Sequence, residues 1–372
     1  MSTFSHLRSA LYILALPILL ASCSRPASSD DHQESPDFAL GADISWYTEY
    51  ETRGYKFYNQ QGVEGDCNQV MKDCGLNAVR LRVWVDPAGR PRPKWAEGMS
   101  GYKADSWCDK TDLLYKCRRA KKAGLDIMVD FHYSDWWADP GHQPVPHAWK
   151  DHDVEQLCQD VAAHTTEVLT LLRDNGIEPR WVQIGNETSN GMVWPVGHAT
   201  PDSCENYARL FIAGYDALKA VFPNAIGIVH LDNGWNPALY DWNLGGLKRY
   251  GAKWDMIGMS LYPYWAHKSD STRQADQTIT DCIANIRRVG DIYRCPVMIT
   301  EVGFEVDESR PEVLQEGKRQ LQRVLREARD STIGYCRGVF YWEPECKPSQ
   351  YRLGAFTEDG HPTIIMDAWT DF

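Results

Sequence analysis

Two glutamates, Glu187 and Glu301, each close an apolar run that is typical of a buried strand. The first run reads Trp-Val-Gln-Ile-Gly-Asn-Glu, and the second reads Pro-Val-Met-Ile-Thr-Glu. An ionised carboxylate at the end of a buried strand is costly unless a partner or a chemical role compensates for it. Cleavage of a glycosidic bond uses two carboxyl groups, one as an acid and one as a nucleophile or base. The pair therefore indicates sugar chemistry.

Other carboxylates stand at or near the ends of strand-like runs and compete for these two roles. They are Asp43, Asp130, Asp135, Asp139, Asp232 and Glu343. We interpret most of them as partners of the reacting groups or as ligands of sugar hydroxyl groups. Glu187 and Glu301 are the predicted catalytic pair.

Strand-like and helix-like segments alternate along the chain after its first 37 residues. Eight strands are predicted at 42–45, 78–84, 126–132, 181–187, 226–231, 256–261, 297–301 and 339–342. Helical patterns lie between them, as at 109–123 before Gly124 and at 154–171 before Asn175 and Gly176. This alternation predicts an α/β fold, a single (β/α)8 TIM barrel over residues 38–372, with an open sheet as the alternative. In such a barrel, active-site groups lie at the C-terminal strand ends, where both glutamates fall.

One predicted strand carries charge on a single face. Arg80 and Arg82 alternate with Val79, Leu81 and Val83. Side chains alternate across a strand, so the apolar face is expected to meet the helices. The two arginines are then expected to point into the barrel mouth, where they need carboxylate partners.

Composition limits the ligand. The chain has 372 residues, 43% of them hydrophobic, and a net charge of -12 with a pI near 5.4. A negative chain without a run of Lys or Arg is a poor match for nucleic acid. A neutral ligand fits better, and the 15 tryptophans could supply stacking platforms for it.

Six further stretches, taken in order, carry a resemblance to a known family. They are 41–45, 79–84, 130–135, 137–140, 183–192 and 338–344. With the Asn186-Glu187 and Thr300-Glu301 motifs, these stretches resemble glycoside hydrolase family 53 of clan A. Members of that family are endo-β-1,4-galactanases acting on the type I arabinogalactan of pectin. The likeness covers about residues 37–372 and implies a hydrolase that acts on β-1,4-galactan.

The resemblance also implies a retaining double displacement, with Glu301 as nucleophile and Glu187 as acid and then base. A negative Glu301 would raise the pKa of Glu187 and keep it protonated until the first step consumes that charge. Asn186 would bind the substrate 2-hydroxyl group. Arg80 and Tyr262 would hold Glu301 ionised and oriented.

Further residues are predicted to bind the sugar chain or to support the site. Predicted stacking residues are Trp46, Trp137, Trp194 and Trp342, and predicted polar ligands or supporting residues are Asp43, His132, Asp139 and His230. The histidines form no His-x-x-x-His pair with an intervening glutamate, so we expect no metal and no cofactor. Some family members bind calcium in loops after the late strands, but the segment 265–270 offers few carboxylates and that site is not expected here.

The N-terminus predicts export and lipid attachment. An apolar stretch at 10–21, too short to span a bilayer, ends in Leu20-Ala21-Ser22-Cys23, which resembles a bacterial lipobox. The resemblance implies a signal peptide over 1–22 and a lipid on Cys23, and the segment 23–37 reads as a flexible tether. An ordinary secretory signal is the alternative. We expect a lipid-anchored monomer of the bacterial cell envelope, facing either the periplasm or the outside.

Ten cysteines remain besides Cys23, and disulfides would be the usual expectation in an exported protein. Spacing argues against several pairs. Cys67 and Cys74 lie seven residues apart in a helical stretch, which separates their Cα atoms by about 10 Å. We therefore predict that several cysteines are free and buried.

Two alternatives remain open at the level of sequence. The chain could be another clan A endoglycanase, such as a mannanase or a cellulase. It could instead be a non-catalytic glycan-binding lipoprotein built on the same barrel, although both carboxylates of the predicted pair are present.

Overall fold

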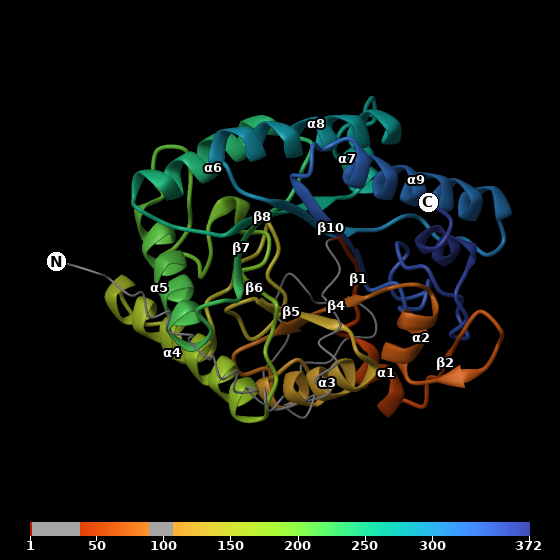
Figure 1. Ribbon diagram of the computed structural model, residues 1–372, viewed down its shortest axis with the longest axis horizontal. Coiled ribbons are helices and arrows are strands. Elements are labelled where there is room, and N and C mark those ends of the chain that lie inside the picture. The colour runs from red at the N-terminus through yellow and green to blue at the C-terminus, as the bar shows by residue number, and fades with distance from the viewer. Residues whose placement is uncertain (2–37, 89–106) are drawn as a thin grey trace. The chain divides into compact units, whose positions relative to one another are not determined.

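The computed structural model describes Met1, residues 38–88 and residues 107–372, and eight parallel strands form a closed barrel in it (Figure 1). The strands are β1 (Ala39–Asp43), β4 (Ala78–Val83), β5 (Asp126–Phe131), β6 (Trp181–Ile184), β7 (Ile226–Leu231), β8 (Met256–Leu261), β9 (Val297–Val302) and β10 (Cys336–Trp342). Each strand pairs with the next in chain order, and β10 closes the barrel on β1. The predicted (β/α)8 barrel is confirmed.

Three predicted strand boundaries were wrong by three residues. The first strand begins at Ala39, and the last begins at Cys336. The strand predicted at 181–187 ends at Ile184. Gly185 (φ 84°) and Glu187 (φ 44°) adopt left-handed backbone conformations, which interrupt the hydrogen bonding between strands. A small hairpin, β2 (Phe57–Tyr58) with β3 (Glu64–Gly65), was not predicted.

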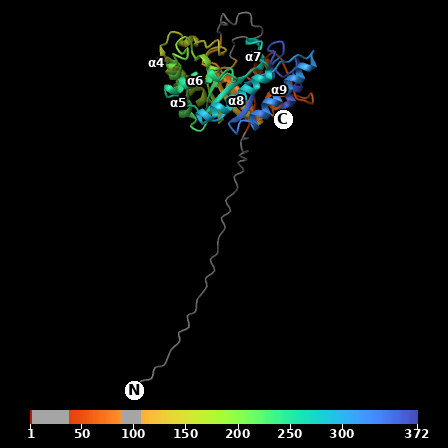
Figure 2. The same cartoon turned by 90° about the horizontal axis from the view of Figure 1, so that it is seen from above.

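Helices cover the outside of the barrel. They are α1 (Tyr47–Thr52), α2 (Cys67–Asp73), α3 (Lys110–Ala123), α4 (Val154–Asp174), α5 (Glu205–Val221), α6 (Pro237–Arg249), α7 (Pro263–Ser269), α8 (Ala275–Tyr293) and α9 (Pro311–Asp330). Figures 1 and 2 show α4 and α5 on one side and α9 on the other, with α6 and α8 between them. The predicted helix at 109–123 is confirmed as α3, with Asp109 accepting hydrogen bonds from two backbone N–H groups at its start and Gly124 (φ 72°) at its end.

The barrel interior changes from apolar to polar along its axis. The layer nearest the N-terminal strand ends is a closed apolar cluster, to which β4, β5, β6 and β7 contribute Ala78, Met128, Trp181 and Ile228. Two residues further along the same strands the inward positions are Arg80, Asp130, Gln183 and His230, all buried. The strands therefore place charge only at their C-terminal ends, above an apolar plug.

Glu301 reaches the interior through an irregularity in the sheet. Regular alternation from Met298 would place Thr300 inside the barrel and Glu301 outside it. The register between β8 and β9 shifts after Met259, so that Ser260 pairs with Glu301. This shift lets both Thr300 and Glu301 turn inward, and Glu301 is only 4% exposed.

The described cysteines are unpaired. All ten are free thiols, eight buried and two half-buried, which confirms the expectation that several are free.

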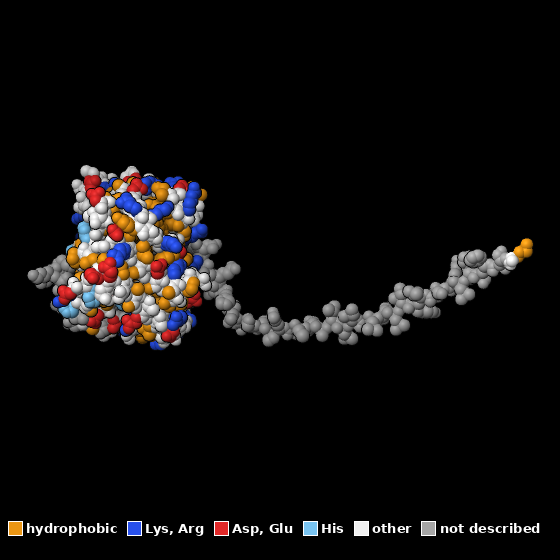
Figure 3. Space-filling model, turned by 90° about the vertical axis from the view of Figure 1, so that its left-hand side faces the viewer, with side chains coloured by type: hydrophobic (Ala, Val, Ile, Leu, Met, Phe, Trp, Pro, Cys, Tyr) orange, Lys and Arg blue, Asp and Glu red, His pale blue; other side chains and the backbone are white. Residues whose placement is uncertain are grey.

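The predictions for residues 1–22 and 23–37, including the lipid on Cys23, lie outside the described residues apart from Met1. Among the described helices, none is long and apolar enough to cross a membrane. Figure 3 shows acidic and basic side chains interspersed with apolar ones on the side of the domain where α4 and α5 lie.

Candidate active site

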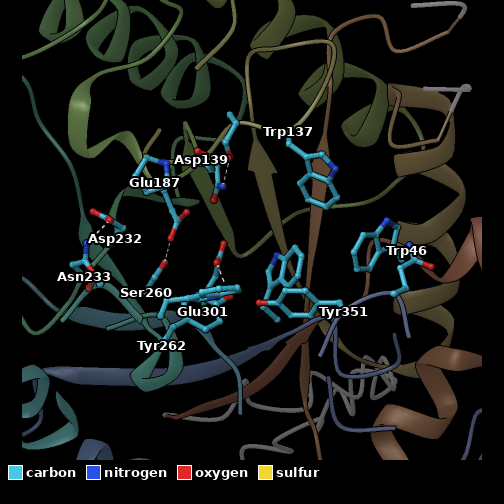
Figure 4. A pocket seen from close by; sticks show the side chains of 17 residues that line it. Trp46, Trp137, Asp139, Glu187, Asp232, Asn233, Ser260, Tyr262, Glu301 and Tyr351 are labelled. Carbon is cyan, nitrogen blue, oxygen red and sulfur yellow. Dashed lines mark hydrogen bonds between the residues drawn. The ribbon is translucent and has the colours of Figure 1, made fainter. Parts of the chain in front are cut away.

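A cleft of about 900 Å³ opens at the C-terminal ends of the strands, and both predicted catalytic glutamates line it. Figure 4 shows the side chains of Glu187 and Glu301 directed into the same part of the cleft. Aromatic residues, including Trp46 and Trp137, lie on one side of the pair, and Asp232 lies on the other. The cleft thus combines two carboxyl groups with an aromatic wall.

The two oxygens of Glu301 have different surroundings. Tyr262 donates a hydrogen bond of 2.9 Å to Oε2. Arg80 Nη2 lies 2.9 Å from Oε1, an ion pair without the alignment of a hydrogen bond. Oε1 is buried, and among the described residues no donor is aligned for a hydrogen bond to it.

Arg80 joins Glu301 to a buried network. Its guanidinium forms ion pairs with Asp43 (2.7 Å) and Asp130 (2.9 Å) and donates hydrogen bonds to Asn186 (2.7 Å) and Gln183 (3.2 Å). Arg80 itself is fully buried. The prediction that this arginine points into the barrel mouth and meets carboxylates is confirmed.

The electrostatics of Glu301 are a balance of opposing effects. Burial favours the neutral carboxyl group, whereas the charge of Arg80 and the hydrogen bond from Tyr262 favour the ionised group. Burial is the larger effect and raises the pKa of Glu301 to about 7. Arg80 and Tyr262 therefore limit the rise in this pKa and do not lower it below the usual value.

Glu187 is held by a hydrogen-bonded relay. Ser260 Oγ donates to Glu187 Oε1 at 2.6 Å, and Ser260 lies 2.8 Å from His230 Nε2. The backbone N–H of Glu187 and the amide of Gln183 both point at His230 Nδ1, at 3.2 and 2.9 Å. This assigns the ring proton to Nε2, so His230 donates to Ser260, which donates to Glu187.

The pKa of Glu187 lies well above that of an exposed glutamate. Burial is the largest cause, followed by the negative charges of Glu301 and Asp232, and the hydrogen bond from Ser260 opposes them. The direction agrees with the prediction, but burial contributes more than the charge of Glu301. Glu187 is therefore the carboxyl group that keeps its proton when Glu301 has lost its own.

Substitution of Ser260 tests this relay. Ser260→Ala removes the donor that favours the ionised form of Glu187, so we expect the pKa of Glu187 to rise. We expect kcat to fall by about tenfold, because the carboxyl group loses its orientation. The basic limb of the pH profile should move to higher pH. A basic limb that stays in place or moves to lower pH would contradict the relay.

The pH dependence of activity should be bell-shaped. In the predicted double displacement, attack requires ionised Glu301, so activity is lost as the pH falls through its raised pKa. In the same mechanism, proton donation requires neutral Glu187, so activity is lost as the pH rises through the raised pKa of that group. Asp232→Asn removes a negative charge that raises the pKa of Glu187, and it should move the basic limb to lower pH. Profiles of kcat/KM for the wild type and this variant measure both limbs.

The structure brings together most of the predicted site residues. Those that line the cleft with the two glutamates are Trp46, Trp137, Asp139, Asn186, Tyr262 and Trp342, and the competing carboxylate Asp232 lines it as well. Asp43 and Arg80 lie buried beneath its floor as supporting residues. Asp130 also supports the floor through Arg80, and Glu343 pairs with Arg82.

Three of the predicted residues do not line the cleft. His132 is buried, and both of its ring nitrogens have partners. Nε2 lies 3.0 Å from a carboxylate oxygen of Asp130, and Nδ1 accepts a hydrogen bond of 2.9 Å from the backbone N–H of Ala138. His230 is buried behind Ser260, as described above. Trp194 lies outside the cleft, where its indole N–H donates to the carbonyl of Asn190 and its ring contacts His198. These side chains act through other residues or by packing.

The aromatic wall of the cleft consists of Trp46, Trp137 and Trp342, and it contacts the buried guanidinium of Arg82. Trp46, Trp137 and Trp342 contact one another with ring centroids 5.4 to 5.7 Å apart. The guanidinium carbon of Arg82 lies 4.1 Å from the ring centroid of Trp137, and the same guanidinium forms an ion pair with Glu343. Arg82 therefore holds the position of the wall by a cation–π contact.

Sequence reasoning missed several residues of the cleft. They are Asn233, Ser260, Trp265, Gln350 and Tyr351. Ser260 was recognisable by its place near the end of a predicted strand. The others follow strands at a greater distance, so only the fold shows that their loops reach the cleft.

The site was also inspected for metal ligands. Within residues 38–88 and 107–372, no group of three or more His, Cys, Asp or Glu side chains is arranged to hold a metal ion. The expectation that the reaction needs no metal remains a prediction.

A (β/α)8 barrel with two carboxyl groups facing one cleft at its C-terminal end defines a glycoside hydrolase. The model of glycosyl hydrolase family 53 matches residues 39–363, and the chain belongs to this family.

Known proteins support this assignment. The chain is 32% identical over 351 residues, 89% of its length and 91% of the relative, to a probable arabinogalactan endo-beta-1,4-galactanase A from Aspergillus terreus. The solved family 53 catalytic domain of Ignisphaera aggregans is 26% identical with a TM-score of 0.76, covering 90% of this chain and 95% of that one. A fungal beta-1,4-galactanase structure shares the fold, with 24% identity, a TM-score of 0.77 and coverage of 90% and 99%.

Proposed function

We propose that this glycoside hydrolase is a retaining endo-β-1,4-galactanase, with Glu301 as nucleophile and Glu187 as acid and base. The observation that carries the proposal is the difference between the two carboxyl groups. Glu301 is oriented by Arg80 and Tyr262, and the positive charge of Arg80 favours its ionised, nucleophilic form. Glu187 is the more easily protonated of the two.

The first step follows from this arrangement. A carboxylate oxygen of Glu301 attacks the anomeric carbon, and the bond from that carbon to the leaving oxygen breaks. Glu187 gives its proton to the leaving oxygen, so the shortened chain departs as an alcohol. The galactosyl group remains attached to Glu301 as an ester. Loss of the Glu301 charge then lowers the pKa of Glu187 and prepares it to act as a base.

The second step reverses these roles. Glu187 takes a proton from water, and the water oxygen attacks the anomeric carbon. The ester bond breaks, and Glu301 regains its charge. Two inversions at one carbon leave its configuration unchanged, which is why the proposed mechanism retains the anomer.

The substrate assignment draws on the relatives. The protein from Aspergillus terreus and the one from Thermothelomyces thermophilus, 30% identical over 315 residues, are both named as arabinogalactan endo-beta-1,4-galactanases. The long cleft with an aromatic wall suits an extended neutral polysaccharide. We propose internal cleavage of β-1,4-galactan and of the pectic arabinogalactan that contains it.

Digestion of purified polysaccharides tests the substrate. Linear β-1,4-galactan should yield oligosaccharides whose length decreases as the digestion proceeds, whereas β-1,4-mannan and cellulose should remain intact. The Glu187→Gln variant is the matched control for contaminating activity. Faster cleavage of mannan or cellulose would overturn the galactanase assignment, and binding of galactan without any cleavage would indicate a glycan-binding protein.

We also propose that the chain is a lipoprotein of the bacterial cell envelope, attached through Cys23. The proposal rests on the lipobox-like sequence that ends at this residue. Metabolic labelling with a fatty acid should mark the wild type and leave Cys23→Ala unmarked. Equal labelling of the two proteins would end the proposal.

A further inference from the structure

Three connections at the N-terminal end of the barrel carry an unusual set of exposed side chains. These connections are 247–255 before β8, 289–297 before β9 and 329–337 before β10. The strands β8, β9 and β10 are neighbours, so their connections lie side by side. The rings of Trp254 and Tyr293 contact at 5.5 Å, and Tyr335 Oη donates to Asp291 at 2.8 Å. The three connections therefore form one continuous surface, which we call the basal surface.

Exposed apolar side chains gather on the basal surface. Ile333 is 81% exposed, Ile292 48% and Tyr250 39%, and they are three of the seven large apolar residues exposed in the described chain. Ile333 also has a φ of 56°, a left-handed conformation that is unfavourable for a β-branched residue. The side chain of Ile333 therefore points into solvent from a strained backbone, and burial in the core does not explain why an apolar residue stands at this position.

The charge of the basal surface is opposite to that of the whole chain. Its three segments contain six Lys or Arg residues and three Asp residues, whereas the chain has a net charge of -12. All three acidic residues are held in ion pairs, Asp255 with Lys219 at 2.6 Å, Asp330 with Arg329 at 2.8 Å and Asp291 with Arg294 at 3.8 Å. The surface therefore has an excess of positive charge.

Lys248 and Arg249 lie in the last turn of α6, where cations are favoured, but helix capping does not account for the other cations. Elsewhere at this end of the barrel, Lys121 and Lys219 donate to backbone carbonyl groups, as cations near helix C-termini commonly do. In the described chain, Lys248, Arg249, Lys253 and Arg337 are exposed and make no hydrogen bond or ion pair. They are free to bind anions outside the protein.

We propose that the basal surface binds the anionic headgroups of a lipid bilayer, with Ile333, Ile292 and Tyr250 entering the interface. Cations flanking exposed aliphatic and aromatic side chains are the chemistry that such an interface recognises. The described barrel begins with β1 at this same end, and Cys23 lies fifteen residues before Phe38. A segment of that length spans at most about 50 Å, so an anchored barrel stays close to the membrane.

The orientation has a functional consequence. The cleft lies at the C-terminal ends of the strands, opposite to the basal surface. A barrel resting on the bilayer by its basal surface directs the cleft away from the membrane. Long polysaccharide chains then reach Glu187 and Glu301 without displacing the enzyme from its membrane. This inference rests on the proposed envelope location, and its test separates the two.

Vesicle binding of the full chain carrying Cys23→Ala tests the surface without an acyl chain. We expect this protein to sediment with vesicles of phosphatidylglycerol and phosphatidylethanolamine, less so as salt rises, and not with vesicles of phosphatidylcholine alone. Adding Lys248→Glu, Lys253→Glu and Ile333→Ser should lower the partition coefficient at least tenfold. A matched control, Lys56→Glu, Lys150→Glu and Val63→Ser, makes the same charge and apolar changes elsewhere and should bind normally.

The outcomes are distinct. Galactan hydrolysis should be equal in all these proteins, which confirms that each is folded. Absence of binding to anionic vesicles, or equal loss in the basal variant and the control, would overturn the proposal. Vesicle binding together with a wild type that takes up no fatty acid would refute only the lipid anchor and leave the basal surface standing.

Discussion

Replacing Glu301 with alanine is expected to lower kcat on galactan by at least about 10⁴-fold, because the variant has no nucleophile to form the glycosyl ester. The fold should survive, since the substitution relieves a buried carboxyl group whose raised pKa shows the cost of its burial. Sodium azide should restore part of the activity by entering the space left by the carboxylate. The azide product would have the α configuration, because it forms by a single inversion.

The control for this variant is Glu312→Ala, which removes an exposed glutamate from the first turn of α9. Its kcat should match that of the wild type. A Glu301→Ala protein that keeps more than about a tenth of the wild-type kcat would remove Glu301 from the nucleophile role. Rescue by azide with a β product would place the attack on the wrong side of the sugar.

Replacing Arg80 is expected to damage both activity and stability. Arg80→Met leaves Asp43, Asp130 and Glu301 buried without their shared counter-charge, which should cost about 3 to 5 kcal/mol in the free energy of unfolding. The pKa of Glu301 should rise further, because Arg80 is the largest influence that lowers it. The variant should therefore lose activity most severely at low pH, where Glu301 is already neutral.

Arg80→Lys separates charge from geometry. A lysine keeps the positive charge, but one ammonium group cannot reproduce the fork that reaches three carboxylates and two amides. We expect a fall in kcat of about 10²-fold with a smaller loss of stability than in Arg80→Met. Arg209→Lys, at an exposed ion pair with Glu155, is the matched control and should change neither quantity. Wild-type activity in Arg80→Lys would show that the network does not orient Glu301.

The sequence predicted the architecture because its strands are strongly patterned. The alternation of strand-like and helix-like segments predicted the barrel. Arg80 and Arg82 alternate with apolar residues in a strand that is buried on its outer face, and this pattern predicted the inward direction of the charges. Six of the eight predicted strands began at the observed residue, and the helix before Gly124 ended where predicted.

The details of the site depended on features that periodicity does not report. The register shift after Met259 turns Glu301 inward, and the left-handed backbone at Glu187 carries it beyond the strand. His132 and His230 were expected to touch sugar because they lie at strand ends. His132 is instead held by Asp130 of the strand that precedes it and by Ala138 of the following loop. His230 contacts Ser260 of the neighbouring strand, which comes close only when the barrel closes.

The most direct test of the account is the configuration of the first product released from linear β-1,4-galactan, followed by proton NMR before mutarotation. The double displacement through Glu301 and Glu187 predicts that the β anomer of the new reducing end appears first. The α anomer would accumulate later as the sugar equilibrates. Initial release of the α anomer would show a single displacement by water and would contradict the role of Glu301 as nucleophile.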